Sequence, residues 1–175
     1  MTHAYHEVDP TQLDTILAHG LMRSSKGSKS EDEAITKTDT LLDEYCPDHL
    51  GNAGVSRENN IYAYLTVGNK ISDITTGQLV DLHDFLNKSH QAVLRLTIDP
   101  DFCYVSDLDA YDKLKLAITA GKPPRLLRPL VEQYWDSLVP YKHFDPSVIK
   151  RPEIMITYDI PPANITHVTS LASHI

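Results

Sequence analysis

The feature of this sequence that most constrains its fold is the placement of its strand-type segments. Stretches rich in β-branched and aromatic residues, which favour strands, occur near the start, in the middle and near the end of the chain. The helix-type segments are grouped between them instead of alternating with them regularly, so a parallel sheet of repeated strand–helix units is not expected. We predict an α+β domain with a mixed, largely antiparallel sheet and intervening helices. The strands are expected at residues 4–8, 61–67, 92–98, 103–105, 153–158 and 165–171.

The first strand is followed at once by the signals that begin a helix. Asp9 stands at an N-cap position, and Pro10 occupies the first helical residue, where the missing N–H costs nothing. The apolar residues that follow recur at helical spacing, and Gly20 ends the run. These signals predict a strand–helix unit over residues 4–20. Further helices are expected at residues 34–45, 79–86, 109–120 and 126–138.

Length and composition indicate a single domain, and we treat residues 1–175 as one unit. A hydrophobic fraction of 41% is enough for a sizeable core. The chain contains no run of ~18 apolar residues, the length needed to span a membrane. Its first residues do not resemble a secretory signal. The two cysteines, Cys46 and Cys103, form no CxxC arrangement, which argues against a disulfide framework and a cysteine-rich zinc site. We therefore expect a reducing, cytoplasmic location and no membrane partner.

The charge of the chain disfavours bulk binding of nucleic acid. The formal net charge is −8, whereas affinity for nucleic acid comes from phosphates that Lys and Arg neutralise. Lys122, Arg125 and Arg128 form a local basic group that could still guide a nucleic-acid strand. The acidic excess weakens nucleic acid as a partner without removing it.

Several common sites have no signature in this sequence. GxGxxG and GxxxxGK[ST] are absent, so neither a dinucleotide-binding fingerprint nor a P-loop is predicted. GxSxG is also absent. The nine histidines show no spacing that would bring three or four metal ligands together. We expect no metal.

Two strand residues are candidates for chemistry. His6, next to Tyr5 on the opening strand, could hold a ribose hydroxyl, because a neutral imidazole both donates and accepts hydrogen bonds. The alternative is a half-buried histidine satisfied by the backbone. Glu153 opens a late apolar strand, where a carboxylate could stabilise a ribosyl cation and orient or deprotonate the attacking group. The alternative is a solvated residue at a strand end.

Both segments resemble parts of one superfamily. The segment YHEVDPTQLDTILAHGL, within residues 4–21, is similar to the opening of ADP-ribosyltransferase-fold proteins, in which a strand histidine precedes a helix and the pattern ILxxGL. The segment RPEIMITYDIPPANI, residues 151–165, resembles the late segment of the same superfamily, particularly of the bacterial toxins that modify DNA. Together they cover about a fifth of the chain in the expected order, and the match between them is loose.

The resemblance implies a role for six residues. Glu153 would be the catalytic carboxylate, and Arg57 would match an arginine that the DNA-modifying toxins use before the central strand. Many relatives have a hydroxyl residue where this chain has Val8, which removes one ribose contact. The alternatives are packing roles for Tyr62 and Tyr64 and the role of an ordinary loop charge for Arg57. NAD binding would fall to Tyr5, His6, Tyr62 and Tyr64.

The resulting hypothesis is an ADP-ribosyltransferase-like enzyme that transfers ADP-ribose from NAD to a macromolecular acceptor, or hydrolyses NAD. Protein, DNA, RNA and water stay open as acceptors, and an antitoxin-like protein partner is a further candidate. One alternative is a non-catalytic module on the same fold that binds a nucleotide or a protein. Another is a small nuclease-type toxin with His6 and Glu7 as acid and base. The transferase assignment, stated in this form, requires His6 and Glu153 to line one cleft.

Overall fold

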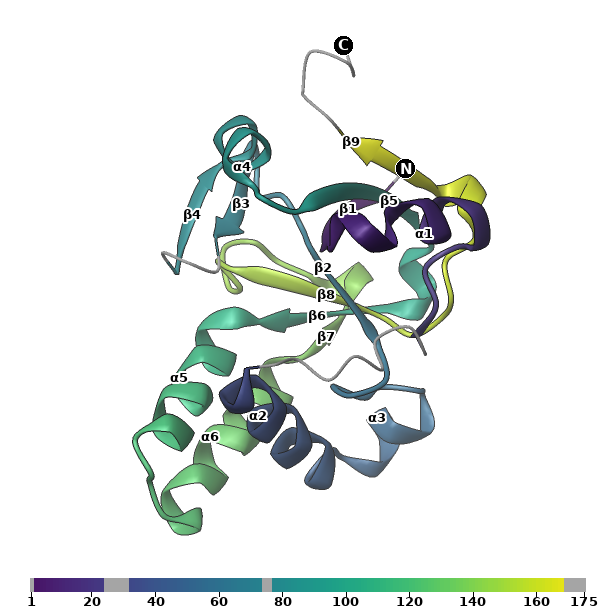
Figure 1. Ribbon diagram of the computed structural model, residues 1–175. Coiled ribbons are helices and arrows are strands. Elements are labelled where there is room, and N and C mark those ends of the chain that lie inside the picture. Colours follow the sequence, from purple (N-terminus) through teal and green to yellow (C-terminus); the bar gives the residue numbers. More distant parts are fainter. Residues whose placement is uncertain (1, 24–31, 74–76, 169–175) are drawn as a thin grey trace.

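The computed structural model describes residues 2–23, 32–73 and 77–168. Its centre is a seven-stranded sheet in the order β7-β6-β8-β2-β1-β5-β9, and every neighbouring pair is antiparallel (Figure 1). A separate hairpin joins β3 and β4. The strands are β1 Thr2–Val8, β2 Ile61–Tyr64, β3 Lys70–Asp73, β4 Gln78–Asp81, β5 Ala92–Ile98, β6 Cys103–Asp107, β7 Val139–Pro140, β8 Pro152–Ile156 and β9 Ile165–Val168.

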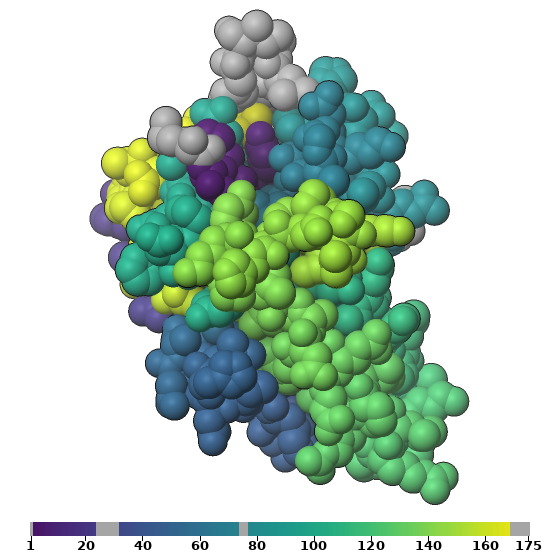
Figure 2. Space-filling view, turned by 180° about the vertical axis from the view of Figure 1, so that it is seen from behind, coloured from purple at the N-terminus to yellow at the C-terminus, as the bar shows by residue number. Residues whose placement is uncertain are grey.

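Six α-helices occur in the described parts of the chain. Helices α2, α5 and α6 lie together on one side of the sheet, and α1 lies on the other (Figures 1 and 2). None of the helices within the described ranges has the length and apolar character that crossing a membrane demands. The α-helices are α1 Leu13–His19, α2 Glu33–Glu44, α3 Asp48–Asn52, α4 Leu82–Lys88, α5 Leu108–Thr119 and α6 Pro124–Ser137.

The predicted α+β class is confirmed, and several details of the prediction are wrong. The sheet is antiparallel throughout, not mixed. Residues 79–86, expected as one helix, are divided between strand β4 and helix α4. The short strands β3 and β7 were not expected, because two to four residues carry too little periodicity to be recognised. Residues 169–171 of the last expected strand lie outside the described part.

The predicted strand–helix unit at the start of the chain is confirmed. Oδ1 of Asp9 accepts a hydrogen bond from the backbone N–H of Thr11 at 2.9 Å, and this cap opens a 3₁₀ turn that leads into α1. Gly20 ends α1 with φ 92°, and the carbonyl oxygen of Ile160 lies 2.5 Å from where its Cβ would be. Only glycine fits this position, where the chain pairs with the segment after β8.

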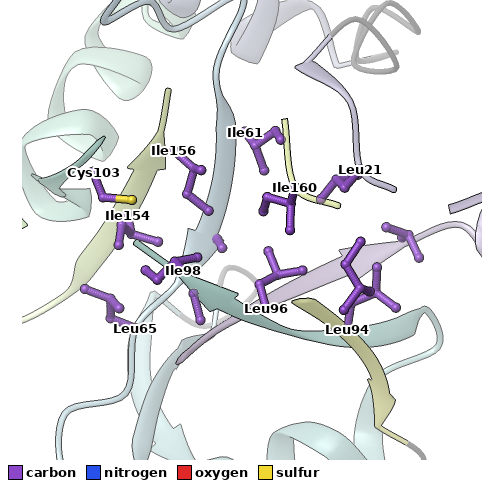
Figure 3. Packing of buried hydrophobic residues seen from close by; sticks show 14 of the residues in the cluster. Leu21, Ile61, Leu65, Leu94, Leu96, Ile98, Cys103, Ile154, Ile156 and Ile160 are labelled. Atoms are coloured by element: carbon purple, nitrogen blue, oxygen red, sulfur yellow. The ribbon is translucent and has the colours of Figure 1, made fainter. Parts of the chain in front are cut away.

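The two faces of the sheet carry different cores. On the α1 side, alternate residues of the strands pack together, among them Leu94 and Leu96 of β5 and Ile154 and Ile156 of β8 (Figure 3). On the opposite side, Met155 packs against residues of α2, α5 and α6. Because side chains alternate along a strand, the residues on either side of Ile154 face the three helices.

The Gly20 junction can be tested by substitution. Gly20→Ala should lower the free energy of unfolding by about 1–3 kcal/mol, because alanine must adopt a positive φ against the carbonyl of Ile160. Urea denaturation measures this change. Gly51→Ala is the matched control, since Gly51 lies in α3 with no atom near its would-be Cβ. Equal stability of the two variants would contradict this account of the junction.

Candidate functional site

One row of side chains crosses four strands on the helix-covered face. The register pairs Tyr5 of β1 with Tyr64 of β2, Tyr64 with Glu153 of β8, and Glu153 with Ser106 of β6. Residues that oppose each other directly in an antiparallel pair share a face. Three of the six residues singled out in the sequence, Tyr5, Tyr64 and Glu153, therefore lie side by side.

Arg57 meets Glu153 in a buried ion pair. Its Nη1 donates to Oε1 of Glu153 at 2.6 Å, although the two residues are 96 positions apart in the chain. Its Nε donates to Oδ1 of Asp39 in α2 at 3.0 Å. The exposed fractions of Arg57 and Glu153 are 4% and 7%. The alternatives of a loop charge for Arg57 and a solvated strand end for Glu153 are therefore wrong.

Aromatic rings enclose the Arg57 guanidinium. Its central carbon lies 3.9 Å from the ring centroid of Tyr62 and 4.4 Å from that of Tyr111. Nη1 also donates to the hydroxyl of Tyr134 at 3.0 Å. A planar guanidinium stacks on aromatic faces while its edge donates hydrogen bonds, a combination that lysine does not provide.

A carboxylate on α2 shapes the loop that carries Arg57. The side chain of Asp43 accepts hydrogen bonds from the hydroxyl of Ser56 at 2.6 Å and from the backbone N–H groups of Arg57 at 2.5 Å and Glu58 at 3.1 Å. Asn60 closes the loop by accepting from the backbone N–H of Ser56 at 2.7 Å. These bonds aim the arginine at the sheet before β2 begins.

The charge states in this cluster are set by burial and by mutual contact. Burial disfavours the charged form of Arg57, but the surrounding oxygens, including those of Tyr134 and Glu153, more than offset it and raise its pKa well above the ordinary value. Burial raises the pKa of Tyr134 to about 12. Burial also raises the pKa of Tyr64, with the charges of Glu153 and Glu7 adding to the effect. The hydroxyls stay protonated at neutral pH.

One oxygen of Glu153 is left open. Both hydrogen bonds to its carboxylate end on Oε1, from Arg57 and from the hydroxyl of Ser106 at 3.4 Å, and Oε2 receives none from residues 2–23, 32–73 and 77–168. The hydroxyl of Tyr64, the cross-strand neighbour of Glu153, likewise has no hydrogen-bond partner within those ranges. A buried acceptor and a buried donor side by side can bind a ligand hydroxyl.

His6 does not share this face, and the predicted common cleft of His6 and Glu153 is wrong. His6 pairs with Leu94 of β5, whose side chain lies in the core beneath α1, whereas Tyr5 and Glu7 alternate to the other face. The Nδ1–H of His6 donates to the backbone oxygen of Tyr62 at 2.5 Å. This is the half-buried histidine satisfied by backbone that was left open as the alternative. The transferase hypothesis in the form that required the His6–Glu153 pair is overturned.

His6 nevertheless belongs to the same network of contacts. Its imidazole holds the carbonyl of Tyr62, the ring of Tyr62 stacks on Arg57, and Arg57 holds Glu153. It acts on the site through β2 and not on a ligand next to Glu153. The nuclease alternative loses its basis, because His6 and Glu7 lie on opposite faces of the sheet.

A hollow of about 300 Å³ lies where β1 and the chain after β2 separate. Strands β1 and β2 pair at one position, Tyr5 with Tyr64. Figure 2 shows the purple atoms of β1 set back between the yellow-green segment after β7 and the blue segment after β2. Three aromatic rings and two threonines suit a flat ring with polar edges. The hollow is lined by Thr2, His3, Tyr5, Leu65, Thr66, Tyr141 and Phe144.

A second hollow of about 500 Å³ lies beside Glu7 of β1 and Phe85 of α4. Glu7 accepts a hydrogen bond from Ser89 at 3.1 Å there, and burial raises its pKa. Phe85 forms part of its wall and packs edge-on against Tyr64 with the ring centroids 6.3 Å apart. Tyr64 thus lies between this hollow and Glu153.

Four residues of the cluster were not singled out in the sequence: Asp39, Ser106, Tyr111 and Tyr134. Ser106 and the two tyrosines carry no local motif, and only the sheet register and the helix packing bring them to Arg57. The spacing of Asp39 and Asp43, one helical turn apart on α2, was the single available signal. Among the described residues no group of three or more potential metal ligands occurs.

A scan of protein-family models, a search of curated proteins and a search of solved structures find no match to this chain. The similarity to the ADP-ribosyltransferase superfamily stays a prediction from two short segments.

The buried ion pair generates a stability prediction. Arg57→Ala should lower the free energy of unfolding by about 3–5 kcal/mol, because it leaves Glu153 and Asp39 buried without their cation. Arg128→Ala is the control, since Arg128 forms an exposed pair with Glu132, and it should cost below about 0.5 kcal/mol. Urea denaturation followed by circular dichroism measures both. Similar costs for the two variants would show that the network does not hold the fold.

Proposed function

We propose that this chain is an ADP-ribosyltransferase-like enzyme whose reaction centre is the Arg57–Glu153 pair. The observation that carries the proposal is the meeting of these two residues. Each was assigned a catalytic role from a separate segment of the sequence, and they form a 2.6 Å ion pair. The second carboxylate oxygen accepts no hydrogen bond from the described residues. His6 is not part of the reaction centre in this proposal.

The geometry suits a reaction that develops positive charge on a sugar carbon. The bond between the ribose carbon and nicotinamide breaks, and its electron pair leaves with nicotinamide. Oε2 of Glu153 stabilises the ribosyl cation, as carboxylates do beside sugar cations in glycosidases. The acceptor then bonds to that carbon, and its proton passes to the carboxylate or to solvent. Arg57 contributes by fixing the carboxylate through Oε1.

The neighbouring groups supply binding. The hydroxyl of Tyr64 is a buried donor next to Glu153 and suits a ribose oxygen. The hollow beside Tyr5 offers aromatic surfaces for a flat ring such as nicotinamide or adenine. The acceptor class stays open between protein, DNA, RNA and water. The net charge of −8 disfavours an acceptor held by its phosphates alone.

A second candidate function is a non-catalytic module that binds a nucleotide or a protein. The observation that favours it is the state of Glu153, whose side chain is only 10% exposed and is neutralised by Arg57. A carboxylate in this state can serve as a structural partner alone. The two candidates make different predictions for NAD.

The first test is Glu153→Gln. The variant keeps the size of the side chain and an oxygen that can accept a hydrogen bond from Arg57. It loses the negative charge that stabilises a ribosyl cation, so nicotinamide release should fall by about 10²–10³-fold. Chromatography of nicotinamide from labelled NAD, incubated with separate pools of protein, DNA and RNA, measures the rate and identifies the acceptor. Glu44→Gln, on the exposed side of α2, is the matched control and should release nicotinamide at the wild-type rate.

The outcomes separate the two candidates. Undiminished NAD turnover by a folded Glu153→Gln protein would refute the assignment of the reaction centre. Binding of NAD by calorimetry without nicotinamide release over long incubation would favour the binding module. Absence of both binding and release would remove NAD from the function altogether.

The second test concerns His6. His6→Ala should lower the free energy of unfolding by about 1–3 kcal/mol, because the carbonyl of Tyr62 loses its donor. The dissociation constant for NAD, measured by calorimetry, should stay within about threefold of the wild-type value, which is below ~1 kcal/mol of binding free energy. A large loss of NAD affinity without loss of stability would restore His6 as a direct ligand.

A further inference from the structure

A groove on the outside of the helical layer lies between the end of α2 and the first half of α6. Two adjoining hollows of about 280 and 130 Å³ share Tyr45, Arg128 and Val131, so they form one continuous surface, the α2–α6 groove. Leu41, Pro124, Arg125 and Leu127 complete the larger hollow. Pro47, Glu132, Trp135 and Asp136 complete the smaller one.

The larger hollow is basic in an acidic protein. It is lined by two arginines and no carboxylate, whereas the net charge of the chain is −8. The side chain of Arg125 forms no ion pair or hydrogen bond with any residue in the described ranges. Among the described residues the ionic partner of Arg128 is Glu132, in an exposed pair at 3.3 Å, which costs little to rearrange. Both guanidinium groups are available to an external anion.

The same surface exposes a large aromatic group. Tyr45, which lines both hollows, is 46% exposed. The guanidinium of Arg128 lies 5.5 Å from the ring centroid of Tyr45, which places charge and apolar surface together. Leu41 and Val131 form the apolar lining of the larger hollow. Arginine and tyrosine around an apolar hollow are the residue types that protein interfaces concentrate.

We infer that the α2–α6 groove docks an acidic segment of a partner protein. A bulky apolar side chain of that segment fills the larger hollow, and carboxylates on either side of it bind Arg125 and Arg128. Nucleic acid is the less suitable occupant, because the larger hollow offers two arginines beside an apolar lining and no row of cations that would neutralise successive phosphates. The inference does not depend on the proposed transferase function.

A synthetic peptide tests the inference on the whole chain. The probe is a short fluorescent peptide with leucine and tryptophan at its centre and glutamates on both sides. Fluorescence anisotropy should detect saturable binding that weakens as salt is raised, since salt screens exposed charges. In NMR spectra, the backbone amide chemical shifts of Tyr45, Arg125 and Val131 should change when the peptide is added. The same peptide with glutamine in place of glutamate should bind at least about tenfold more weakly, a difference of ~1.4 kcal/mol.

Charge reversal supplies the matched controls. Arg125→Glu with Arg128→Glu should weaken binding of the acidic peptide by at least about tenfold. Lys142→Glu with Lys150→Glu changes the net charge equally at exposed sites outside the groove and should change affinity by less than about twofold.

Three results would overturn the inference. The first is no binding of the acidic peptide at millimolar concentration. The second is equal affinity of both double variants for it. The third is salt-sensitive binding of single-stranded oligothymidine at the groove in place of the peptide, which would identify a nucleic-acid surface instead.

Discussion

The burial of one guanidinium group constrains the centre of this molecule. A charged arginine leaves water at high cost unless anions and hydrogen-bond acceptors replace its hydration. Arg57 obtains them from Asp39 on α2, Glu153 on β8 and Tyr134 on α6. These elements are far apart in the chain, so the loop before β2, the sheet and two helices must all be in place before the charge is compensated.

The same compensation leaves Glu153 only partly satisfied. Arg57 and Ser106 both address Oε1, while Oε2 faces no donor within the described ranges. A network built for stability alone would gain from a donor at this oxygen. The hydroxyl of Tyr64 beside it has no hydrogen-bond partner among the described residues. This open position is the reason we propose that the cluster is a reaction centre as well as a structural one.

Strand register decides which candidates can act together. A shift of one residue moves a side chain to the opposite face. Tyr5 therefore joins Tyr64 and Glu153, while its neighbour His6 turns toward the core beneath α1. His6 contacts the cluster through the carbonyl of Tyr62, so we propose a positioning role for it. The helical layer that closes the Arg57 cluster from one side presents the α2–α6 groove on its other side.

Local chemistry in the sequence determined the α+β class, the capped helix after β1 and its end at Gly20, because caps, proline and glycine act within a few residues. It also identified Glu153 as a candidate through a short segment that resembles a known superfamily, and Arg57 through its place before the central strand. It could not determine the faces on which His6 and Glu153 lie, nor the roles of Asp39, Ser106, Tyr111 and Tyr134. Those depend on strand order, register and helix packing, which are set by contacts between residues far apart in the chain, and only the tertiary structure decided them.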